Sequence, residues 1–319
     1  MKASDPGLLH LDAHDIARLL TPAEAADAVE QVLRDGLDPE HCPPRTHVAV
    51  PAGQLLLMPA AAGPYAGVKI AGVVPANPGR GLPRITGSYL LLDGVTLVPL
   101  ALLDGAALTA LRTPAVSAVA LRRLAAPDAG HAVLFGAGPQ AYGHLEAALA
   151  ELPLSRVTVV ARRPERAQAL VDHARGRGLD ARIGGPGDVS ESDLVICCTT
   201  AREPLFDGDL VPDRATVIAV GSHEPDARET GTELVRRADV YVESRAAALR
   251  EAGDLIIPEA EGAVAPGYFA GTLAELVGGS VTVTGGRPRL FKSVGMAWED
   301  LAVAAAVHRR ATAGPSGAT

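Results

Sequence analysis

A glycine-rich motif carries the strongest chemical signal in this sequence. In the stretch AVLFGAGPQAYGHL, Gly136-x-Gly138-x-x-Ala141 follows an apolar run and precedes a segment with helical spacing. Gly136 permits a tight turn, Gly138 lets the backbone approach a pyrophosphate, and Ala141 keeps strand and helix close. Amides at the start of the helix would then face the phosphates. The motif predicts a dinucleotide site, and the alternative is a tight glycine turn that binds nothing.

The end of the next strand bears on which dinucleotide is bound. A site for NAD usually places Asp or Glu there, where the carboxylate accepts from the ribose 2′-hydroxyl. Here the strand VTVV runs into Ala161-Arg162-Arg163 and offers no acid. Arginine pairs well with a 2′-phosphate. We therefore expect NADPH as the cofactor, with NADH possible and two solvated arginines as the alternative.

Two cations lie in apolar surroundings and are candidates for binding an anion. Lys69 is one of three lysines in the chain and lies in YAGVKIAGVV. A buried lysine is costly unless it is paired, which favours a substrate carboxylate over an edge-strand lysine that reaches solvent. Arg112 directly precedes Thr113-Pro114, which has the pattern of a helix start. An anion there would meet a guanidinium and a helix N-terminus together, unless Arg112 is a surface residue at a helix–helix junction.

Two further cations have less distinctive surroundings. Arg45, in PPRTHVAV, is an equal candidate for a binding residue or an ordinary surface residue. Lys292, in FKSVGMAWED, is equally compatible with a surface position. The sequence around them does not separate these alternatives.

The elements that must position these residues fall into two groups. Thr21, Pro22 and Glu24 form a capping box that predicts a helix ending near Asp35. Alternating segments then predict an antiparallel sheet, followed by a helix over 106–111 and a second helix from Thr113 to about 124. The expected strands are His47–Val50, Gln54–Met58, Tyr65–Val74, Ile85–Leu92 and Val95–Leu100.

From His131 the pattern changes to alternating strands and helices. This alternation predicts an α/β fold with a doubly wound parallel sheet of the Rossmann type. The expected strands are 132–135, 157–160, 181–183, 194–198, 217–220, 240–242, 281–284 and 290–291, and the expected helices are 140–150, 164–175 and 298–310. We expect a second α/β domain from 1–127 with 291–312, a Rossmann domain over 128–290, and a disordered tail over 313–319.

Composition excludes several classes of function. The 319 residues carry a net charge of −8 without a basic block, so no nucleic-acid partner is expected. No apolar run reaches the roughly 20 residues that a membrane span needs, and the first residues do not resemble a leader peptide. Three cysteines and nine scattered histidines have no metal-ligand spacing. We expect a cytoplasmic protein without a metal.

Over nearly its whole length the sequence resembles the ornithine cyclodeaminase/mu-crystallin family. The resemblance rests on PPRTHVAV, LLLMPA, GVKIAG, LTALRTPAVSAVA, LFGAGPQAYGH, CCTTAREPLF, AVGSHEPDARE and FKSVGMAWEDLA, in this order. It implies a Rossmann domain and a dimerising α/β domain built from the N-terminal part and the C-terminal helix. A homodimer and a small imino-acid or amino-acid substrate are therefore expected.

The resemblance also implies roles for individual residues. Arg45, Lys69 and Arg112 would hold a substrate carboxylate near the nicotinamide, and Val294 and Gly295 would face the substrate. The implied cofactor contacts are Thr113, Gly136, Gly138, Pro139, Gln140, Ala161, Arg162, Arg163, Thr199, Thr200, Gly221, Ser222, His223 and Ser293. We assign the catalytic steps to Lys69, Arg112 and His223.

Two departures from the family pattern bear on the reaction. The cyclodeaminases carry a Glu just before the Leu-Met-Pro of LLLMPA, where this chain has Leu56, and a catalytic Asp where it has His223. Cyclodeamination needs carboxylates to manage a cationic amine. The pattern is more similar to the ketimine reductases. His223 can donate a proton near neutral pH, and the alternative is a loop histidine that touches cofactor or solvent.

The first hypothesis is therefore an NAD(P)H-dependent reductase of a cyclic 2-imino acid. The candidate substrates are 1-pyrroline-2-carboxylate and 1-piperideine-2-carboxylate, with the proton supplied by Lys69, His223 or solvent. A second hypothesis is an amino-acid dehydrogenase or synthase of specialised metabolism, and cyclodeamination stays possible. A third is an NADPH-bound, crystallin-like binding protein with little turnover.

Overall fold

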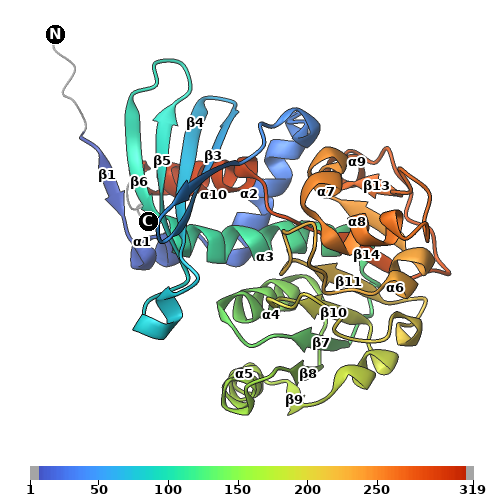
Figure 1. Cartoon of the computed structure of the whole chain (residues 1–319). Helices are drawn as coiled ribbons and strands as arrows, with labels where there is room; N and C mark the ends of the chain where they lie inside the picture. Colours follow the sequence, from blue (N-terminus) through green and yellow to red (C-terminus); the bar gives the residue numbers. More distant parts are fainter. Residues whose placement is uncertain (1–6, 314–319) are drawn as a thin grey trace, which may run out of the picture. The chain divides into compact units, whose positions relative to one another are not determined.

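The computed structural model describes residues 7–313 (Figure 1), which form two compact units. The sheet unit comprises 7–37, 41–112 and 296–313, and the Rossmann unit comprises 38–40 and 113–295. The boundaries expected from the sequence were 127/128 and 290/291, whereas the structure divides at 112/113 and 295/296. The first division lies inside a helix, α3 (Gly105–Leu124), which runs from one unit into the other.

The sheet unit is built on a six-stranded mixed sheet with the order β1-β6-β5-β4-β3-β2. Strand β1 is parallel to β6, and the other neighbours are antiparallel. Its elements are β1 (Leu9–Leu11), α1 (Ala13–Leu19), α2 (Pro22–Arg34), β2 (Thr46–Val50), β3 (Gly53–Ala62), β4 (Tyr65–Val73), the 3₁₀ turn η2 (Asn77–Arg80), β5 (Ile85–Asp93), β6 (Pro99–Asp104) and α10 (Ala297–Thr312).

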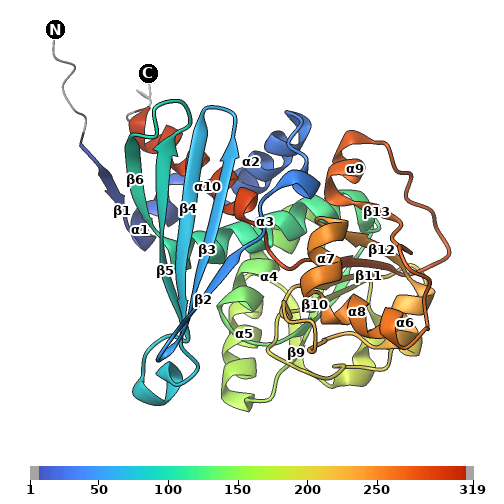
Figure 2. The same ribbon diagram turned by 45° about the horizontal axis from the view of Figure 1, so that its top comes forward.

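Helix α10 covers one face of this sheet. It packs against β3, β4, β5 and α2, and both views show it running across the strands (Figure 2). Every residue from Ala297 to Val307 is buried. Side chains alternate between the two faces of a strand, so Lys69, Ala71 and Val73 of the central strand β4 share one face, where all three are buried.

The expected helix start at Thr21 is confirmed. The Thr21 hydroxyl accepts from the Glu24 amide, and the Glu24 carboxylate accepts from the Thr21 amide at 2.9 Å. These two bonds satisfy donors that the first turn of a helix leaves without intrahelical partners. They fix the beginning of α2, the helix that packs against α10.

The Rossmann unit contains an eight-stranded sheet in which every pairing is parallel. The strand order β13-β12-β14-β11-β10-β7-β8-β9 confirms the α/β class and the doubly wound sheet predicted from the sequence. Its elements are η1 (Pro39–His41), β7 (His131–Phe135), α4 (Pro139–Glu151), β8 (Arg156–Val160), α5 (Pro164–Gly176), β9 (Asp180–Ile183), η3 (Pro186–Glu191), β10 (Leu194–Cys197), η4 (Gly208–Leu210), β11 (Thr216–Ala219), α6 (Thr232–Arg237), β12 (Asp239–Val242), α7 (Arg245–Glu251), α8 (Gly253–Ala260), β13 (Gly271–Thr272), α9 (Leu273–Gly278) and β14 (Arg289–Lys292).

The expectation of two helices over 106–124 was wrong. Helix α3 is continuous, and Pro114 lies inside it. Proline removes one helical hydrogen bond, but the helix continues because the residues that follow, from Ala115 to Leu121, are buried in the core. The pattern of threonine followed by proline therefore does not mark a helix N-terminus at Thr113.

Two expected strands also differ in the structure. Residues 281–284 form no strand, and Val95 to Val98 form an exposed turn before β6 begins at Pro99. The Asp93 carboxylate accepts from the amides of Val95 and Thr96 at 3.1 and 2.7 Å, as aspartate often does in turns. Apolar side chains in a turn were thus mistaken for the beginning of a strand.

Residues 1–6 and 314–319 lie outside the described part of the chain, so the tail expected to be disordered lies almost wholly outside it. Within residues 7–313, no helix combines the length and apolar character that crossing a membrane requires.

Candidate functional site

The cofactor residues expected in the Rossmann unit gather at the carboxyl-terminal end of its parallel sheet. They follow the carboxyl ends of β14, β11, β10, β7 and β8, which are consecutive neighbours in the sheet. Chain order reverses between β7 and β10, and nucleotides bind outside this end at such a reversal in open α/β sheets. The segments concerned are 136–140 after β7, 161–163 after β8, 199–200 after β10, 221–223 after β11 and Ser293 after β14.

The glycine motif has the geometry that a nucleotide loop needs. Gly136 has φ +109°, and a Cβ atom there would lie 2.7 Å from the Cys198 carbonyl oxygen. Gly138 caps α4, and a Cβ atom added to it would meet no other atom within 4 Å. Ala141 is fully buried against the core. The open space at Gly138, beside the amides of the first helical turn, fits a pyrophosphate group.

Arg162 and Arg163 follow the carboxyl end of β8 and are both exposed. Arg163 occupies the N-cap position of α5. No carboxylate stands between β8 and α5, because the connection consists of Ala161, Arg162 and Arg163. The loop offers two solvent-facing guanidinium groups where an NAD site would offer an acid.

A buried glutamate fastens two of the cofactor loops together. Glu229 Oε1 accepts from the Thr199 amide and the Thr199 hydroxyl, each at 2.7 Å, and Oε2 accepts from the Gly221 amide at 2.6 Å. Glu229 is fully buried, and this burial raises the pKa of its carboxyl group. The side chain thus joins the residues that follow β10 to those that follow β11.

Lys292 is buried, so the surface position considered from the sequence was wrong. Its Nζ lies 3.0 Å from Asp254 Oδ2 and donates to the Ser222 carbonyl oxygen at 2.6 Å. Asp254 Oδ1 also accepts from the amides of Glu229 and Thr230, both at 2.8 Å. This ion pair joins β14 to α8, and its two side chains also hold the backbone at Ser222 and at Glu229 and Thr230.

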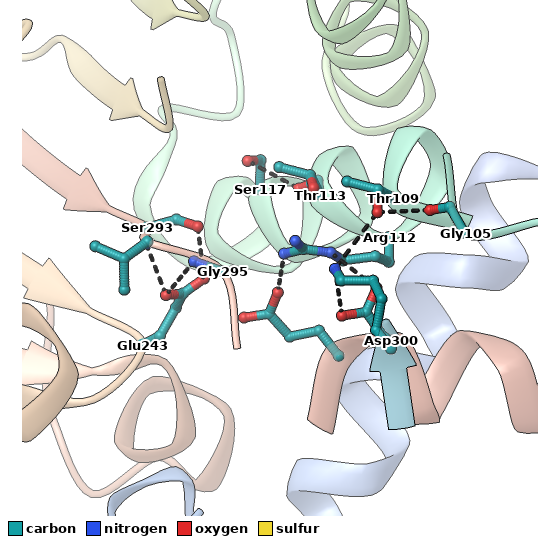
Figure 3. Close-up of polar contacts among 12 residues, drawn as sticks. Gly105, Thr109, Arg112, Thr113, Ser117, Glu243, Ser293, Gly295 and Asp300 are labelled. Atoms are coloured by element: carbon teal, nitrogen blue, oxygen red, sulfur yellow. Dashed lines mark hydrogen bonds and ion pairs between the residues drawn. The ribbon is translucent and has the colours of Figure 1, made fainter. Parts of the chain in front are cut away.

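A second buried acid organises the segment that follows β14. Glu243 accepts from the Ser293 hydroxyl at 2.5 Å and from the amides of Val294 and Gly295 at 2.9 and 3.1 Å. Figure 3 shows the Glu243 carboxylate turned toward Ser293 and Gly295. Glu243 directly follows β12, the strand beside β14. It fixes the backbone of the segment that the family resemblance assigns to the substrate.

In the sheet unit, Lys69 is neither exposed nor on an edge strand. It lies on β4 between β3 and β5, with 4% of its surface exposed. Its Nζ donates to Asp300 Oδ2 at 2.8 Å and lies 3.4 Å from the Thr109 hydroxyl. A fully buried carboxylate of α10 therefore balances the charge of Lys69.

Arg112 lies beside a second carboxylate of the same helix. Its guanidinium donates to Glu299, and its Nε lies 3.4 Å from Asp300 Oδ1. Arg112 is 6% exposed, and both acids are fully buried. Figure 3 shows Asp300 reaching from α10 toward Arg112, with Thr109 on the preceding turn of α3. Because α3 is continuous here, the helix N-terminus expected to join Arg112 in an anion site is absent.

Burial and neighbouring charges change the proton affinity of Lys69. Its pKa is lowered to about 8, chiefly by burial and further by the positive charges of Arg112 and Arg45, while Asp300 opposes this change. Arg45, partly exposed ahead of β2, is therefore close enough to act on Lys69 electrostatically. Of the four cations considered from the sequence, three therefore interact electrostatically, since Arg112 and Arg45 both act on Lys69.

The surroundings of Lys69 are otherwise apolar. Met58 of β3 and Tyr89 of β5 are its direct cross-strand partners, and both are buried. Leu56, which replaces the cyclodeaminase glutamate, is buried on the same face in a cluster with Ala71 and Val73. This face offers an apolar surface where a cyclodeaminase would present a carboxylate.

Two further residues expected at the site, Thr113 and His223, differ in their exposure. Thr113 is buried within α3, and its carbonyl oxygen accepts from the Ser117 hydroxyl at 3.3 Å. His223 is exposed in the loop that follows β11. Within residues 7–313, no group of three or more His, Cys, Asp or Glu side chains is arranged to hold a metal ion.

Sequence reasoning did not identify the buried acids. The residues concerned are Glu229, Glu243, Asp254, Glu299 and Asp300. Glu229 ends the quoted stretch AVGSHEPDARE, and Glu299 and Asp300 lie in FKSVGMAWEDLA. The signal that could have identified these three acids was their position in stretches that carry the family resemblance. Acids in the first turn of a helix are, however, usual on helix-dipole grounds alone.

Comparison with known proteins agrees with the fold. The family model described as "Ornithine cyclodeaminase/mu-crystallin family" matches residues 9–315. Ketimine reductase mu-crystallin of Mus musculus is 34% identical over 294 residues, which cover 91% of each chain.

Two solved structures extend this comparison. Thermococcus litoralis Δ(1)-pyrroline-2-carboxylate reductase in complex with NADH and L-proline has a TM-score of 0.90 and 32% identity, covering 95% of this chain and 97% of that chain. An archaeal alanine dehydrogenase dimer with bound NAD has a TM-score of 0.91 and 27% identity, covering 97% and 98%. Both relatives carry a nicotinamide cofactor. The chain belongs to the ornithine cyclodeaminase/mu-crystallin family and is one of its NAD(P)-dependent oxidoreductases.

Proposed function

We propose that this protein uses NADPH, or NADH, to reduce the C=N bond of a cyclic 2-imino acid. The substrates are of the 1-pyrroline-2-carboxylate or 1-piperideine-2-carboxylate type, and the products are proline or pipecolate. The observation that carries the proposal is the cluster formed by buried Lys69 and Arg112 with partly exposed Arg45, beside an apolar sheet face. The named relatives, a ketimine reductase and a pyrroline-carboxylate reductase, support the same reaction class.

The cations of the cluster favour a substrate with a carboxylate. Lys69 donates to Asp300 and Arg112 donates to Glu299, and Arg45 is close enough to act on Lys69 electrostatically. Arginine binds a carboxylate through two parallel hydrogen bonds and so fixes its plane, while lysine adds a point charge. We assign the binding of the substrate carboxylate to these three residues.

The residues at the carboxyl-terminal end of the Rossmann sheet fit a nicotinamide dinucleotide. Gly138 and Gln140 would hold the pyrophosphate, and Thr199, Gly221 and Ser293 would line the path toward the nicotinamide. Exposed Arg162 and Arg163 favour NADPH, because they provide a pair for a 2′-phosphate. NADH stays a possible cofactor, as it occupies the T. litoralis relative.

The roles of the chain's own residues follow from these assignments. When bound, the reduced nicotinamide supplies the hydride. Lys69, Arg112 and Arg45 hold the carboxylate, which fixes the orientation of the neighbouring C=N carbon and lowers the entropic part of the barrier. Val294 and Gly295, whose amides are fixed by Glu243, would contact the substrate ring. Lys69 is the favoured source of the proton for the imine nitrogen, with His223 and solvent as the alternatives.

Two positions argue against cyclodeamination. Leu56 is buried in an apolar cluster on the same sheet face as Lys69, so it cannot pair with the cationic side chain of a diamine. His223 stands where the cyclodeaminases carry an aspartate. A neutral ring without a second amine suits this face better, because an unpaired cation buried there would be costly.

We also propose a homodimer that forms on the sheet face opposite α10. Val48, Leu55 and Ile70 point to that face and are 41%, 36% and 44% exposed. Val48 and Leu55 are direct cross-strand partners, and Leu57 joins Leu55 to Ile70 across the sheet. A contiguous exposed apolar patch of this kind is typical of an interface. Sedimentation at several protein concentrations tests the proposal, and a stable monomer would contradict it.

The reductase proposal is tested by following the absorbance of NADPH, and then NADH, with cyclic imino acids and with open-chain 2-oxo acids plus amines. Oxidation with a cyclic imine alone is the expected result, and Arg112→Ala should abolish most of it. Activity only with a 2-oxo acid and an amine would indicate an amino-acid dehydrogenase or synthase. Ammonia release from a diamine would indicate a cyclodeaminase. Cofactor binding with no turnover across the panel would indicate a binding protein.

A further inference from the structure

Adjacent acids on α10 pair with the two buried cations of the cluster. Asp300 Oδ2 accepts from Lys69 Nζ at 2.8 Å, and Glu299 accepts from the Arg112 guanidinium. Asp300 Oδ1 also lies 3.4 Å from Arg112 Nε. Both acids lie in the first turn of a helix whose residues are buried from Ala297 to Val307. One helix thus supplies both carboxylates, and Asp300 is the one that accepts from Lys69.

Stability alone does not explain these buried pairs. Removing two charges from water is costly, and a buried ion pair seldom stabilises a fold more than apolar residues of similar size would. The rest of the buried α10 surface is mostly alanine, valine and leucine, which shows that apolar packing suits this position. A buried, paired lysine at the centre of a sheet is better explained by the chemistry that it performs.

We propose that Asp300 is a positioning residue whose carboxylate holds the Lys69 ammonium in place and keeps it charged, so that Lys69 delivers a proton to the imine nitrogen. This inference rests on the reductase function proposed above, and it identifies Lys69 rather than His223 or solvent as the proton donor. Glu299 is the matched partner of Arg112 and takes no part in the proton transfer.

The proton transfer balances with the hydride transfer. As the hydride forms a C–H bond at the imine carbon, the π electrons of the C=N bond move to nitrogen. The ring nitrogen then takes a proton from the Lys69 ammonium, and the product is a secondary amine. Lys69 is left as a neutral amine beside Asp300 and regains its proton from solvent before the next turnover.

The charged and titratable groups that face Lys69 come from four elements or their flanks. They are Asp300 on α10, Arg112 on α3, Arg45 ahead of β2, and Tyr89 on β5; the β3 neighbour, Met58, is uncharged. Burial and the two arginines lower the pKa of Lys69 to about 8, and Asp300 raises it. Lys69 is therefore charged below about pH 8, and reductase activity should fall as the pH rises through that value.

The lowered pKa of Lys69 also affects how the stability of the fold depends on pH. Because the pKa of Lys69 is lower in the folded protein than its ordinary value of 10.5, the unfolded chain binds more protons between about pH 8 and 10.5. Stability should therefore rise with pH across that window as far as Lys69 is concerned. Activity and stability respond to this one residue in opposite directions, so a falling rate above pH 8 does not indicate unfolding at Lys69.

Lysine NMR of the intact protein tests the inference without requiring turnover. The chain has three lysines, so Cε labelling with ¹³C gives few signals, and Lys69→Arg assigns that of Lys69. In Asp300→Asn the pKa of Lys69 should fall by about one to three units, because an opposite charge within contact distance is lost. The matched variant Glu299→Gln should leave it close to the wild-type value, and Asp300→Glu should restore most of it. An unchanged Lys69 pKa in Asp300→Asn would overturn the inference.

Kinetics separate this inference from the proposed function. In the wild type, the fall of kcat/KM at alkaline pH should coincide with the Lys69 titration, and Asp300→Asn should move both to lower pH together. If Asp300→Asn does not fold, the wild type and the Asp300→Glu variant still test the inference. In each of them, a kcat/KM that does not fall at the pH where Lys69 titrates would contradict it. An NMR shift without reduction of any imine would overturn the proposed reductase function and its proton step, while the Asp300–Lys69 coupling would stand.

Discussion

At the scale of single residues, the proposed preference for NADPH rests on Arg162 and Arg163. Both are exposed at the end of β8, where a ligand can reach them. This position is where NAD and NADP sites differ in chemistry, since one needs an acceptor and the other a cation.

Replacing both arginines should change the cofactor preference. The double variant Arg162→Ala/Arg163→Ala loses charge-assisted bonds to a 2′-phosphate, each of which contributes about 1.5–3 kcal/mol. The KM for NADPH should therefore rise about tenfold or more, while that for NADH stays nearly constant. Steady-state kinetics with both cofactors measure this ratio. Arg166→Ala, an exposed arginine on α5, is the matched control, and equal losses with NADPH and NADH would contradict the assignment.

Single residues also show where sequence analysis stops. Lys69 stood out because a lysine within an apolar strand is rare, and the structure places it in the buried cluster. Asp300 did not stand out, because an acid in the first turn of a helix already has a local explanation in the helix dipole. Only the packing of α10 on β4, which joins residues 231 positions apart, gives Asp300 its meaning.

At the scale of elements, the ends of strands carry the candidate cofactor site, and buried acids join them. The sequence predicted the strand–loop–helix units well, because their hydrophobic period and glycine motif are local. It failed at Pro114, where tertiary burial overrides the tendency of proline to end a helix. It failed again at Val95 to Val98, where apolar residues lie in an exposed turn.

The Lys292–Asp254 pair should be a main support of this arrangement. Both side chains are fully buried, and they join β14 to α8. Lys292→Met leaves the Asp254 carboxylate buried without its cation, so the free energy of unfolding should fall by about 3–5 kcal/mol. Denaturant unfolding measures this difference.

An exposed pair provides the control for that measurement. Asp128 lies 2.9 Å from Arg214, with side chains that are 73% and 52% exposed, so Asp128→Asn should cost no more than about 1 kcal/mol. The double variant Lys292→Met/Asp254→Asn should recover part of the loss, since no unpaired charge stays buried. A loss in Lys292→Met no larger than that in Asp128→Asn would contradict the support role.

At the scale of the whole molecule, the two proposed halves of the chemistry belong to different units. The residues proposed to bind the dinucleotide follow five adjacent strands of the Rossmann unit, and the cations proposed to bind the carboxylate belong to the sheet unit. Family membership accounts for both halves in one chain, because relatives that align over nearly the whole length carry NADH with L-proline or NAD. The central claim is that hydride passes from the cofactor to the imine carbon.

Isotope transfer tests that claim most directly. The protein would be given 1-pyrroline-2-carboxylate and NADPH deuterated at the transferable C4 position, and the product would be analysed by mass spectrometry and NMR. The account predicts proline with one deuterium at its α-carbon, formed in step with cofactor oxidation. Proline without deuterium at that carbon, or no proline while the cofactor is demonstrably bound, would contradict it.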